Sequence, residues 1–397
     1  MNTKNGNKKP SAMNGSSNVK VQNSDVQNAM AQAERYRVSV EQYLTFLSTG
    51  FLVVPQLVSP QEIAELRQHT EELMQGRLPE QNRTMAERDV RSDKGTTGQS
   101  LEAPPEHLSP EEKAQFFLRI HMLHRQLELH ERFMLHPRVL DVLESLIGPD
   151  VLAMQTMLFL KPPGKPGQGW HQDAFYIPTI PDTVIGAWIA IDDTDEQNGA
   201  MWFAQGSQIE PIYPPRGDGV YGYGQRDLNN IAYVGGVSDP DDEKNDLSRV
   251  AGKYPQVLCS AKAGDVVFFG SHVLHRSKKN WSQDRTRRSF VSHYCNARSF
   301  TQWGGEAPSR DPHAAPTVDA ATGMTNGSHI LARGNTHLPF ARPRFGTPCA
   351  ALLSEEERRS QSAFAAASMA DMNSGMMASM ETRPNEEHDH VGETGVM

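Results

Sequence analysis

From Val151 to Asn296 the chain is a series of short apolar runs, each bounded by glycine, proline, asparagine or aspartate. The runs are rich in β-branched and aromatic residues, which is typical of strands. Because these runs follow a helical region, we expect an α+β, mainly β domain whose strands form a sandwich or barrel. The runs read "VLAMQTMLFLKPPG", "TVIGAWIAIDD", "AMWFAQGS", "DVVFFGSHVLH" and "RSFVSHYCN".

Helix signals precede the strands. The Ser-Pro-x-Glu sequence that starts at Ser59 is a capping box with proline in the first turn, and apolar residues then repeat at helical spacing up to Gly76. The same signal at Ser109 predicts a second helical stretch that runs through "AQFFLRIHMLHRQLELHERFMLH". A third helix, "RVLDVLESLIG", is expected to end at Gly148.

The composition changes at both ends. Residues 1–36 are rich in Asn, Ser, Lys and Gln, and residues 365–397 are polar apart from methionines, so both are expected to be disordered tails. Between them we expect one catalytic domain over residues 37–350. Its helical part would cover residues 37–150 and its strands residues 151–300.

Inside the strand region, residues 210–253 are rich in glycine and aspartate. This segment is longer than an ordinary connection, and we expect it to form an insertion over one end of the strands.

The overall composition limits the partners. The 397 residues carry a net charge of −9, which gives no electrostatic reason to expect nucleic acid or an anionic membrane surface. There is no apolar run of membrane-spanning length, no apolar segment of a secretory signal near residue 1 and no peroxisomal Ser-Lys-Leu ending, so a cytoplasmic protein is expected. We expect its partner to be a small-molecule substrate; the oligomeric state stays open.

Polar side chains interrupt two of the apolar segments. In "GWHQDAFYI", His171 and Asp173 would share one face of a strand, and "AGDVVFFGSHVLHRSKKN" ends in His272 and His275. Two imidazoles and one carboxylate form the ligand set of non-haem Fe(II) oxygenases. The same set can hold a catalytic zinc ion, so the histidines and the aspartate alone leave both metals open.

A second feature separates the two metals. In "QDRTRRSF", Arg287 and Ser289 share one strand face, whereas Arg288 is on the other. Arginine binds carboxylates through two parallel hydrogen bonds, so this pair is a candidate site for the far carboxylate of 2-oxoglutarate. The alternative is a basic turn in which Arg285, Arg287 and Arg288 are all in solvent.

Taken together, these motifs resemble the phytanoyl-CoA dioxygenase family. The resemblance rests on the ordered run "AMQTMLFLKPPG…GWHQDAFYI…GAWIAIDD…NGAMWFAQGSQ…AGDVVFFGSHVLHRSKKN…RTRRSF" and on "YLTFLSTGFLVVPQLVSPQEIAELR" near the start. It implies a double-stranded β-helix (a jelly roll, cupin-like) with an N-terminal helical part. It also implies Fe(II) as the metal, with 2-oxoglutarate and O2 as co-substrates.

The resemblance also assigns residues. His171, Asp173 and His275 are the implied iron ligands; His272 competes with His275, but the family pattern "LHrSkkN" matches from His275 onward. The spacing departs from the family pattern in one respect: Arg287 lies twelve residues after His275, where eleven are expected. The position eleven residues after His275 is occupied by Thr286. The implied co-substrate residues are Arg287, Ser289, Ser277, Trp188, Met157 and, on the helical stretch, Arg119.

The implied reaction is hydroxylation of a small-molecule or acyl substrate, with 2-oxoglutarate decarboxylated to succinate and CO2. Two alternatives use the same scaffold: a catalytically inactive β-helix binding protein, and a zinc-dependent hydrolase at the same three ligands.

Overall fold

The structure is a computed structural model, and it describes residues 35–82, 88–91, 95–98, 103–213, 245–301, 329–338, 341–343 and 345–346, with only the backbone for 82, 88–91 and 95–98. Nearly all of the N-terminal tail, the whole of the C-terminal tail and residues 214–244 of the expected insertion lie outside the described residues.

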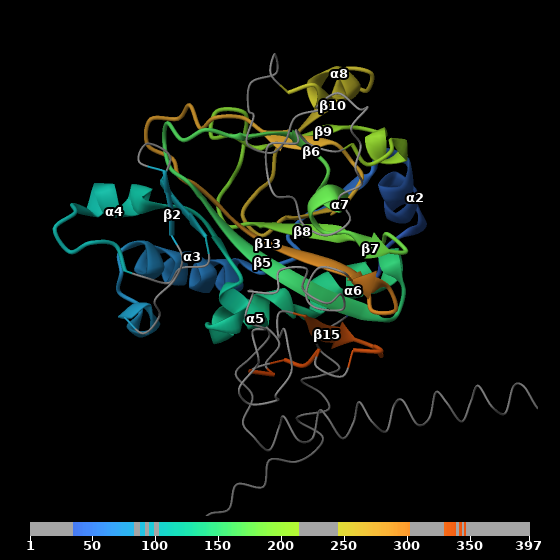
Figure 1. The fold of residues 1–397 in the computed structure, drawn as a ribbon, viewed down its shortest axis with the longest axis horizontal. Helices are drawn as coiled ribbons and strands as arrows, with labels where there is room; N and C mark the ends of the chain where they lie inside the picture. The colour runs from blue at the N-terminus through green and yellow to red at the C-terminus, as the bar shows by residue number, and fades with distance from the viewer. Residues whose placement is uncertain are drawn as a thin grey trace, which may run out of the picture. The chain divides into compact units, whose positions relative to one another are not determined.

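Two sheets, antiparallel except for the β3–β4 pair, are stacked face to face at the centre of the described domain (Figure 1). The large sheet has the order β1-β11-β8-β13-β5-β4-β3-β2, with β15 also paired to β5; the small sheet has the order β10-β9-β12-β6. A third, two-stranded sheet pairs β7 with β14. The strands are β1 (Phe51–Val54), β2 (Arg88–Arg91), β3 (Gly95–Gly98), β4 (Phe117–His121), β5 (Val151–Lys161), β6 (Gln168–His171), β7 (Thr179–Ile180), β8 (Ile185–Ala190), β9 (Met201–Ala204), β10 (Gln256–Cys259), β11 (Val266–Gly270), β12 (His275–Ser277), β13 (Arg287–Asn296), β14 (Phe300–Thr301) and β15 (Ile330–Arg333).

The strand order defines the fold. Eight strands form the core, and the chain passes from one sheet to the other at β6, β8, β9, β11, β12 and β13. Counted along the chain from β5 and without the short β7, the large sheet contains core strands 6-3-8-1 and the small sheet 5-4-7-2. This interleaved order is a jelly roll, so the double-stranded β-helix expected from the sequence is confirmed.

Helices cover the outer face of the large sheet. The apolar sides of α3 (Pro60–Met74), α5 (Glu128–Met134) and α6 (Pro137–Ile147) pack onto it and form the largest hydrophobic cluster of the described chain (Figure 1). The capping boxes expected at Ser59 and Ser109 are present, and α6 ends at Gly148 as expected. The other helices are α2 (Val40–Thr49), α4 (Pro110–Phe116), α7 (Asp173–Tyr176), α8 (Leu247–Ala251) and the 3-10 turns η1 (Pro79–Asn82), η2 (Leu123–Arg125) and η3 (Ser207–Ile209).

The helical stretch expected after Ser109 is confirmed only in part: α4 and α5 are helical, but a strand interrupts them. Helix α4 ends at Phe116, and the next five residues form strand β4, which pairs antiparallel with the edge of β5. An aromatic and β-branched segment beside an open sheet edge gains ladder hydrogen bonds as a strand, and this pairing outweighs its helical pattern. Arg119 therefore lies on a strand, opposite Phe159 of β5, rather than on a helix.

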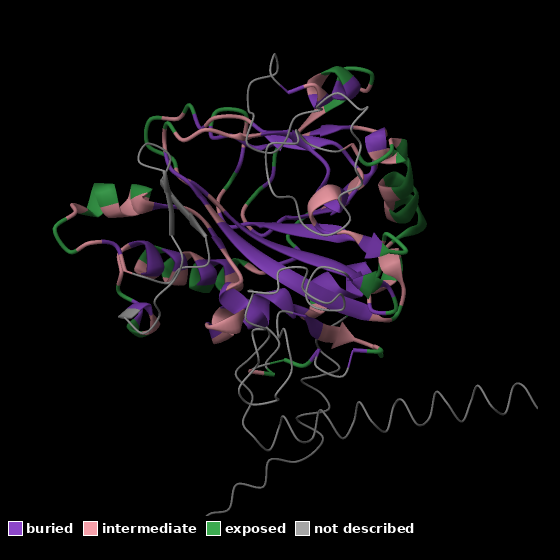
Figure 2. Cartoon of the chain, in the orientation of Figure 1, coloured by how far each residue is buried: buried purple, intermediate pink, exposed green. Residues whose placement is uncertain are grey.

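The two faces of β13 show where the site must lie. Phe290 and Tyr294 point into the helix-covered core, whereas Arg287, Val291 and His293 line a pocket. The central strands are buried along most of their length, while α2 has no buried residue (Figure 2). The pocket is thus enclosed between the two sheets.

Among the helices that the structure describes, none has both the length and the apolar character needed to cross a membrane. The cytoplasmic location expected from the sequence stays a prediction.

Candidate metal and co-substrate site

Three buried side chains converge where β6 and β12 lie side by side. His171 is the last residue of β6, His275 is the first of β12, and the two are paired across the small sheet. Asp173 is the first residue of the short helix α7, so the strand ends before it and the expected alternation along one strand was wrong. The chain nevertheless brings one possible ligand atom from each of the three residues within 4.8 Å of the others.

The donor atoms of this triad have the arrangement that a metal needs. The Nε2 atoms of His171 and His275 lie 3.7 and 3.8 Å from Oδ1 of Asp173. Atoms bound to one ion through bonds of about 2.1 Å lie at most about 4.2 Å apart, so these separations fit a shared ion.

Hydrogen bonds fix which ring nitrogen is available. Nδ1 of His171 donates to the carbonyl of Gly169 at 2.8 Å, and Nδ1 of His275 donates to that of Val273 at 3.1 Å. A carbonyl only accepts, so each Nδ1 carries the proton and each Nε2 keeps its lone pair toward Asp173. Burial, followed by the nearby His275, lowers the pKa of His171 to about 3, which keeps the ring in the neutral form that ligates metals.

A chain of buried amide and imidazole groups supports the carboxylate, and the sequence analysis missed it. The Gln155 amide donates to Nδ1 of His293 at 3.1 Å, and Nε2 of His293 donates to Oδ2 of Asp173 at 2.9 Å. Burial alone would raise the pKa of Asp173, but His275 and the hydrogen bond from His293 lower it well below the usual range. One oxygen of Asp173 is thus held by His293, and the other faces the two histidine ligand atoms.

His272, the competing histidine, is not part of the triad. Its Nε2 lies 2.6 Å from Oδ2 of Asp182, and its Nδ1 lies 3.1 Å from the carbonyl of Glu210. The hydrogen bond to Asp182 raises the pKa of His272, which favours the charged ring rather than a ligand.

The triad lies in a pocket that contains about 490 Å³ of space between atoms, part of it open to solvent. Of the co-substrate residues expected from the sequence, Met157, Trp188, Ser277 and Arg287 line it. Ser289 lies behind Arg287 and accepts a hydrogen bond from its Nη1 at 3.0 Å. Arg119 is not among the lining residues; its guanidinium lies 5.9 Å from the ring centre of Phe159, which does line the pocket.

Arg287 is a buried cation without a carboxylate partner among the described residues. Its side chain lies beside Trp188, 5.8 Å from the guanidinium carbon to the ring centre, and burial lowers its pKa to about 10. By contrast, Arg285 forms an ion pair with Asp195. Arg288 forms ion pairs with Asp192 and Glu71. The alternative considered from the sequence, a basic turn in solvent, therefore applies to Arg285 but not to Arg287, whose side chain faces the pocket.

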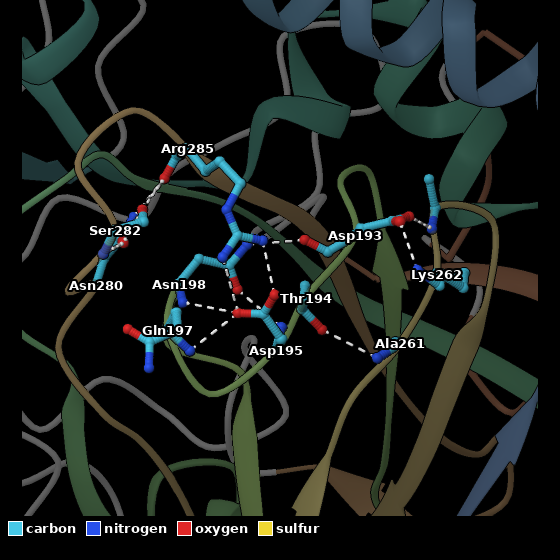
Figure 3. Close-up of polar contacts among 11 residues, drawn as sticks. Asp193, Thr194, Asp195, Gln197, Asn198, Ala261, Lys262, Asn280, Ser282 and Arg285 are labelled. Carbon is cyan, nitrogen blue, oxygen red and sulfur yellow. Dashed lines mark hydrogen bonds and ion pairs between the residues drawn. The ribbon is translucent and has the colours of Figure 1, made fainter.

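The loop before β13 explains how Arg287 reaches the pocket despite the extra residue. Arg285 donates twice to Asp195, and Ser282 caps the turn by donating to the Arg285 carbonyl (Figure 3). Asn280 donates to the same carbonyl and to the carbonyl of Lys161. The loop is thus held at both ends, and β13 begins at Arg287 with its side chain directed inward.

A second buried cation, Lys161, was also missed. Its Nζ donates to the Ser277 hydroxyl and to the Lys278 carbonyl, both at 2.9 Å, and no carboxylate of the described chain lies within ion-pair distance. Burial, followed by the nearby Arg287, lowers the pKa of Lys161 well below its ordinary value. A lysine that ends an apolar strand before "PPG" was the available signal.

These groups fit a metal and a dicarboxylic acid. The triad offers two neutral nitrogens and one anionic oxygen, which suits Fe(II) or another divalent ion. Two buried cations with no carboxylate beside them cost free energy unless an anion joins them, so the pocket has the charge that a bound carboxylate would complete.

Comparison with known proteins agrees with this reading. The sequence profile of the phytanoyl-CoA dioxygenase family (PhyH) matches residues 46–289. The chain belongs to this family. It is therefore a 2-oxoglutarate-dependent oxygenase, and the His171, Asp173 and His275 triad is its candidate metal site.

Curated relatives cover most of the domain. Peroxisomal phytanoyl-CoA dioxygenase of Bos taurus is 29% identical over 265 residues, which span 66% of this chain and 69% of the relative. The phytanoyl-CoA dioxygenase domain-containing protein 1 of Danio rerio is 26% identical over 287 residues, 66% of this chain and 91% of the relative.

Solved structures show a weaker likeness. The α-ketoglutarate-dependent epimerase SnoN from nogalamycin biosynthesis is 18% identical with a TM-score of 0.49, covering 74% of this chain and 98% of that one. EctD from S. alaskensis, solved with 2-oxoglutarate and 5-hydroxyectoine, is 19% identical with a TM-score of 0.45, covering 66% and 77%.

Proposed function

We propose that this protein is a dioxygenase that hydroxylates a small-molecule or acyl substrate, with His171, Asp173 and His275 as its iron ligands and Arg287 as the anchor of 2-oxoglutarate. The observation that carries the proposal is the pocket itself, in which two free Nε2 atoms and one carboxylate oxygen converge and a cation without a carboxylate lies on the wall. A hydrolase at the same triad would leave Arg287 with no role.

The residues would share the work as follows. Arg287 and Ser277 bind the far carboxylate of 2-oxoglutarate, so that its oxo-acid end is directed toward the triad. Ser289 holds the guanidinium of Arg287 in place through the 3.0 Å hydrogen bond. Iron, when bound with 2-oxoglutarate and O2, supplies the oxidising chemistry that inserts oxygen into a C–H bond and leaves succinate and CO2.

Other residues keep the pocket in shape. Met157 and Trp188 form an apolar wall that excludes water from the co-substrate, and His293 holds Asp173 in the orientation that leaves Oδ1 free. Arg119 lies on β4, opposite Phe159 of β5, where its charge can attract an anion into the pocket. Relatives named for phytanoyl-CoA support an acyl substrate, and a small molecule fits the same chemistry.

The test is an anaerobic titration of the Fe(II)-loaded protein with 2-oxoglutarate, followed by the weak visible charge-transfer band of the chelate. We expect a band in the wild type and a requirement for about 100-fold more 2-oxoglutarate in Arg287→Ala, because a charge-assisted double hydrogen bond contributes about 3 kcal/mol. The matched control is Arg285→Ala, which removes an arginine that pairs with Asp195 on the surface.

Each result has a distinct meaning. An equally strong band in Arg287→Ala would move the anchor to another cation. A folded, iron-loaded wild type without any band, and without succinate production in air, would refute the dioxygenase and leave the zinc hydrolase or the binding protein.

A further inference from the structure

Lys161 ends β5 directly behind the wall of the pocket. Its side chain is 5% exposed, and its Nζ faces three oxygen atoms: the Ser277 hydroxyl at 2.9 Å, the Lys278 carbonyl at 2.9 Å and the Gly199 carbonyl at 3.4 Å. Carbonyl oxygens only accept, so in the charged form, which a bound dianion stabilises, two ammonium protons go to the carbonyls and the third goes to Ser277. Every proton of the ammonium group therefore has an acceptor.

Counting donors and acceptors at Ser277 gives the orientation of its own proton. The hydroxyl oxygen accepts from Lys161 and, at 3.2 Å, from the backbone N–H of Gln168. A hydroxyl has two lone pairs and one proton, so both lone pairs are taken and the O–H must be donated elsewhere. Because Ser277 lines the pocket, the direction left for its O–H is toward a ligand there.

The backbone around Lys161 is shaped for this arrangement. Gly199 has a φ of +79°, and a Cβ there would lie 2.6 Å from the Lys278 carbonyl oxygen and 3.2 Å from Nζ of Lys161. A larger residue would therefore push on both the lysine and one of its acceptors. Asn280 in addition donates to the carbonyl of Lys161 at 2.9 Å, which fixes the end of the strand.

We propose that Lys161 is a positioning residue for 2-oxoglutarate: it holds the Ser277 hydroxyl as a fixed donor to the far carboxylate that Arg287 binds. This inference rests on the proposed function. A Ser277 hydroxyl fixed in this way gives the pocket a preference for a five-carbon oxo-acid with a second carboxylate over one that ends in a methyl group. The lysine acts through Ser277 and does not itself line the pocket.

The preference can be measured with two ligands of equal length. The Fe(II)-loaded full-length protein is titrated anaerobically with 2-oxoglutarate and with 2-oxopentanoate, which lacks the far carboxylate, and the charge-transfer band is followed. In Lys161→Met we expect 2-oxoglutarate binding to weaken by about 10-fold or more and 2-oxopentanoate binding to change less than twofold. Lys165→Met, four residues later on the loop, is the matched control and should behave as the wild type.

A merely structural role would give another pattern. If Lys161→Met weakens both acids equally, or weakens neither, the proposal is wrong although the proposed function stands. If Lys161→Met does not fold, Lys161→Gln replaces it, because the amide keeps two N–H donors for the two carbonyls and loses the third. In a Ser277→Ala background, Lys161→Met should add less than twofold; a full additional loss would overturn the route through Ser277. A wild type without a band for either acid would refute the proposed function, and this inference with it.

Discussion

Removing the imidazole behind Asp173 should weaken metal binding without touching a ligand. In His293→Leu, Oδ2 of Asp173 loses the donor at 2.9 Å, and the Gln155 amide loses its acceptor at 3.1 Å. The leucine fills most of the space, so the change removes hydrogen bonds rather than the wall of the pocket. Asp173 would then be free to rotate away from the arrangement in which Oδ1 faces the two histidines.

The expected size follows from the kind of bond that is lost. A hydrogen bond to a charged carboxylate contributes about 1.5–3 kcal/mol, which is about 10- to 150-fold in a dissociation constant. Losses of about 10- to 100-fold are typical when a group that orients a metal ligand is replaced. We therefore expect the Kd for Fe(II) to rise by about 10- to 100-fold in His293→Leu and less in His293→Gln, because glutamine keeps an N–H donor.

The assay is anaerobic competition for Fe(II) against a coloured chelator, without 2-oxoglutarate, together with circular dichroism to verify folding. His272→Leu is the matched control, since it removes a histidine that bonds to a different carboxylate, Asp182, at 2.6 Å. Equal weakening in both variants, or unchanged affinity in His293→Leu, would refute the reasoning.

Three further predictions concern stability and the anchor. Burial lowers the pKa of His69 to about 4 from its ordinary 6.5, so the stability that the neutral ring contributes is present above pH 6.5 and is lost as the pH falls from 6.5 toward 4. In His69→Gln, the difference in unfolding free energy between pH 7.5 and pH 5.5, measured by urea unfolding of the metal-free protein, should be about 1 kcal/mol smaller than in the wild type, and an unchanged difference would contradict this. Asp192→Asn should destabilise the fold by about 3 kcal/mol in the same assay, because it leaves the largely buried Arg288 without its main partner; a loss below 1 kcal/mol would argue against it. Arg285→Ala breaks an exposed pair with Asp195 and should cost at most about 1 kcal/mol with 2-oxoglutarate affinity unchanged, so a loss of affinity would mean that this loop positions the anchor.

Most of the fold could be predicted from the sequence of the strand-rich region. Short apolar runs bounded by turn residues predicted most of the core strands, though not β10, and the capping boxes at Ser59 and Ser109 located two helix starts. Strand β4 could not be predicted in this way, because its stability comes from pairing with β5, about 40 residues later along the chain, rather than from its own pattern. The expected alternation of His171 and Asp173 failed for a related reason: the strand ends at its pairing with β12, and only the folded chain shows that Asp173 turns back toward it.

The residues that the sequence analysis missed lie on strands that it had identified. Arg287 and Ser289 were predicted to share one face of β13, and the same alternation, continued along the strand, reaches Val291 and His293. His293, three two-residue repeats beyond the candidate anchor Arg287, was therefore open to prediction as a residue directed into the same pocket.

Lys161 carries the broader lesson about this site. Alternation gives the face on which a side chain lies, but the role of a buried cation depends on what is absent around it, and only the assembled fold shows which carboxylates are in reach. Of the arginines in "RTRR", two have carboxylate partners and Arg287 has none in the described chain, and Lys161 shares that property from the neighbouring strand. Two such cations side by side repel each other, so their joint burial is costly in the free protein and becomes favourable when an anion binds between the sheets. We therefore expect the pocket to bind a dianion more tightly than a monoanion, with Arg287 in direct contact and Lys161 acting through Ser277, and the paired titrations with 2-oxoglutarate and 2-oxopentanoate measure this difference.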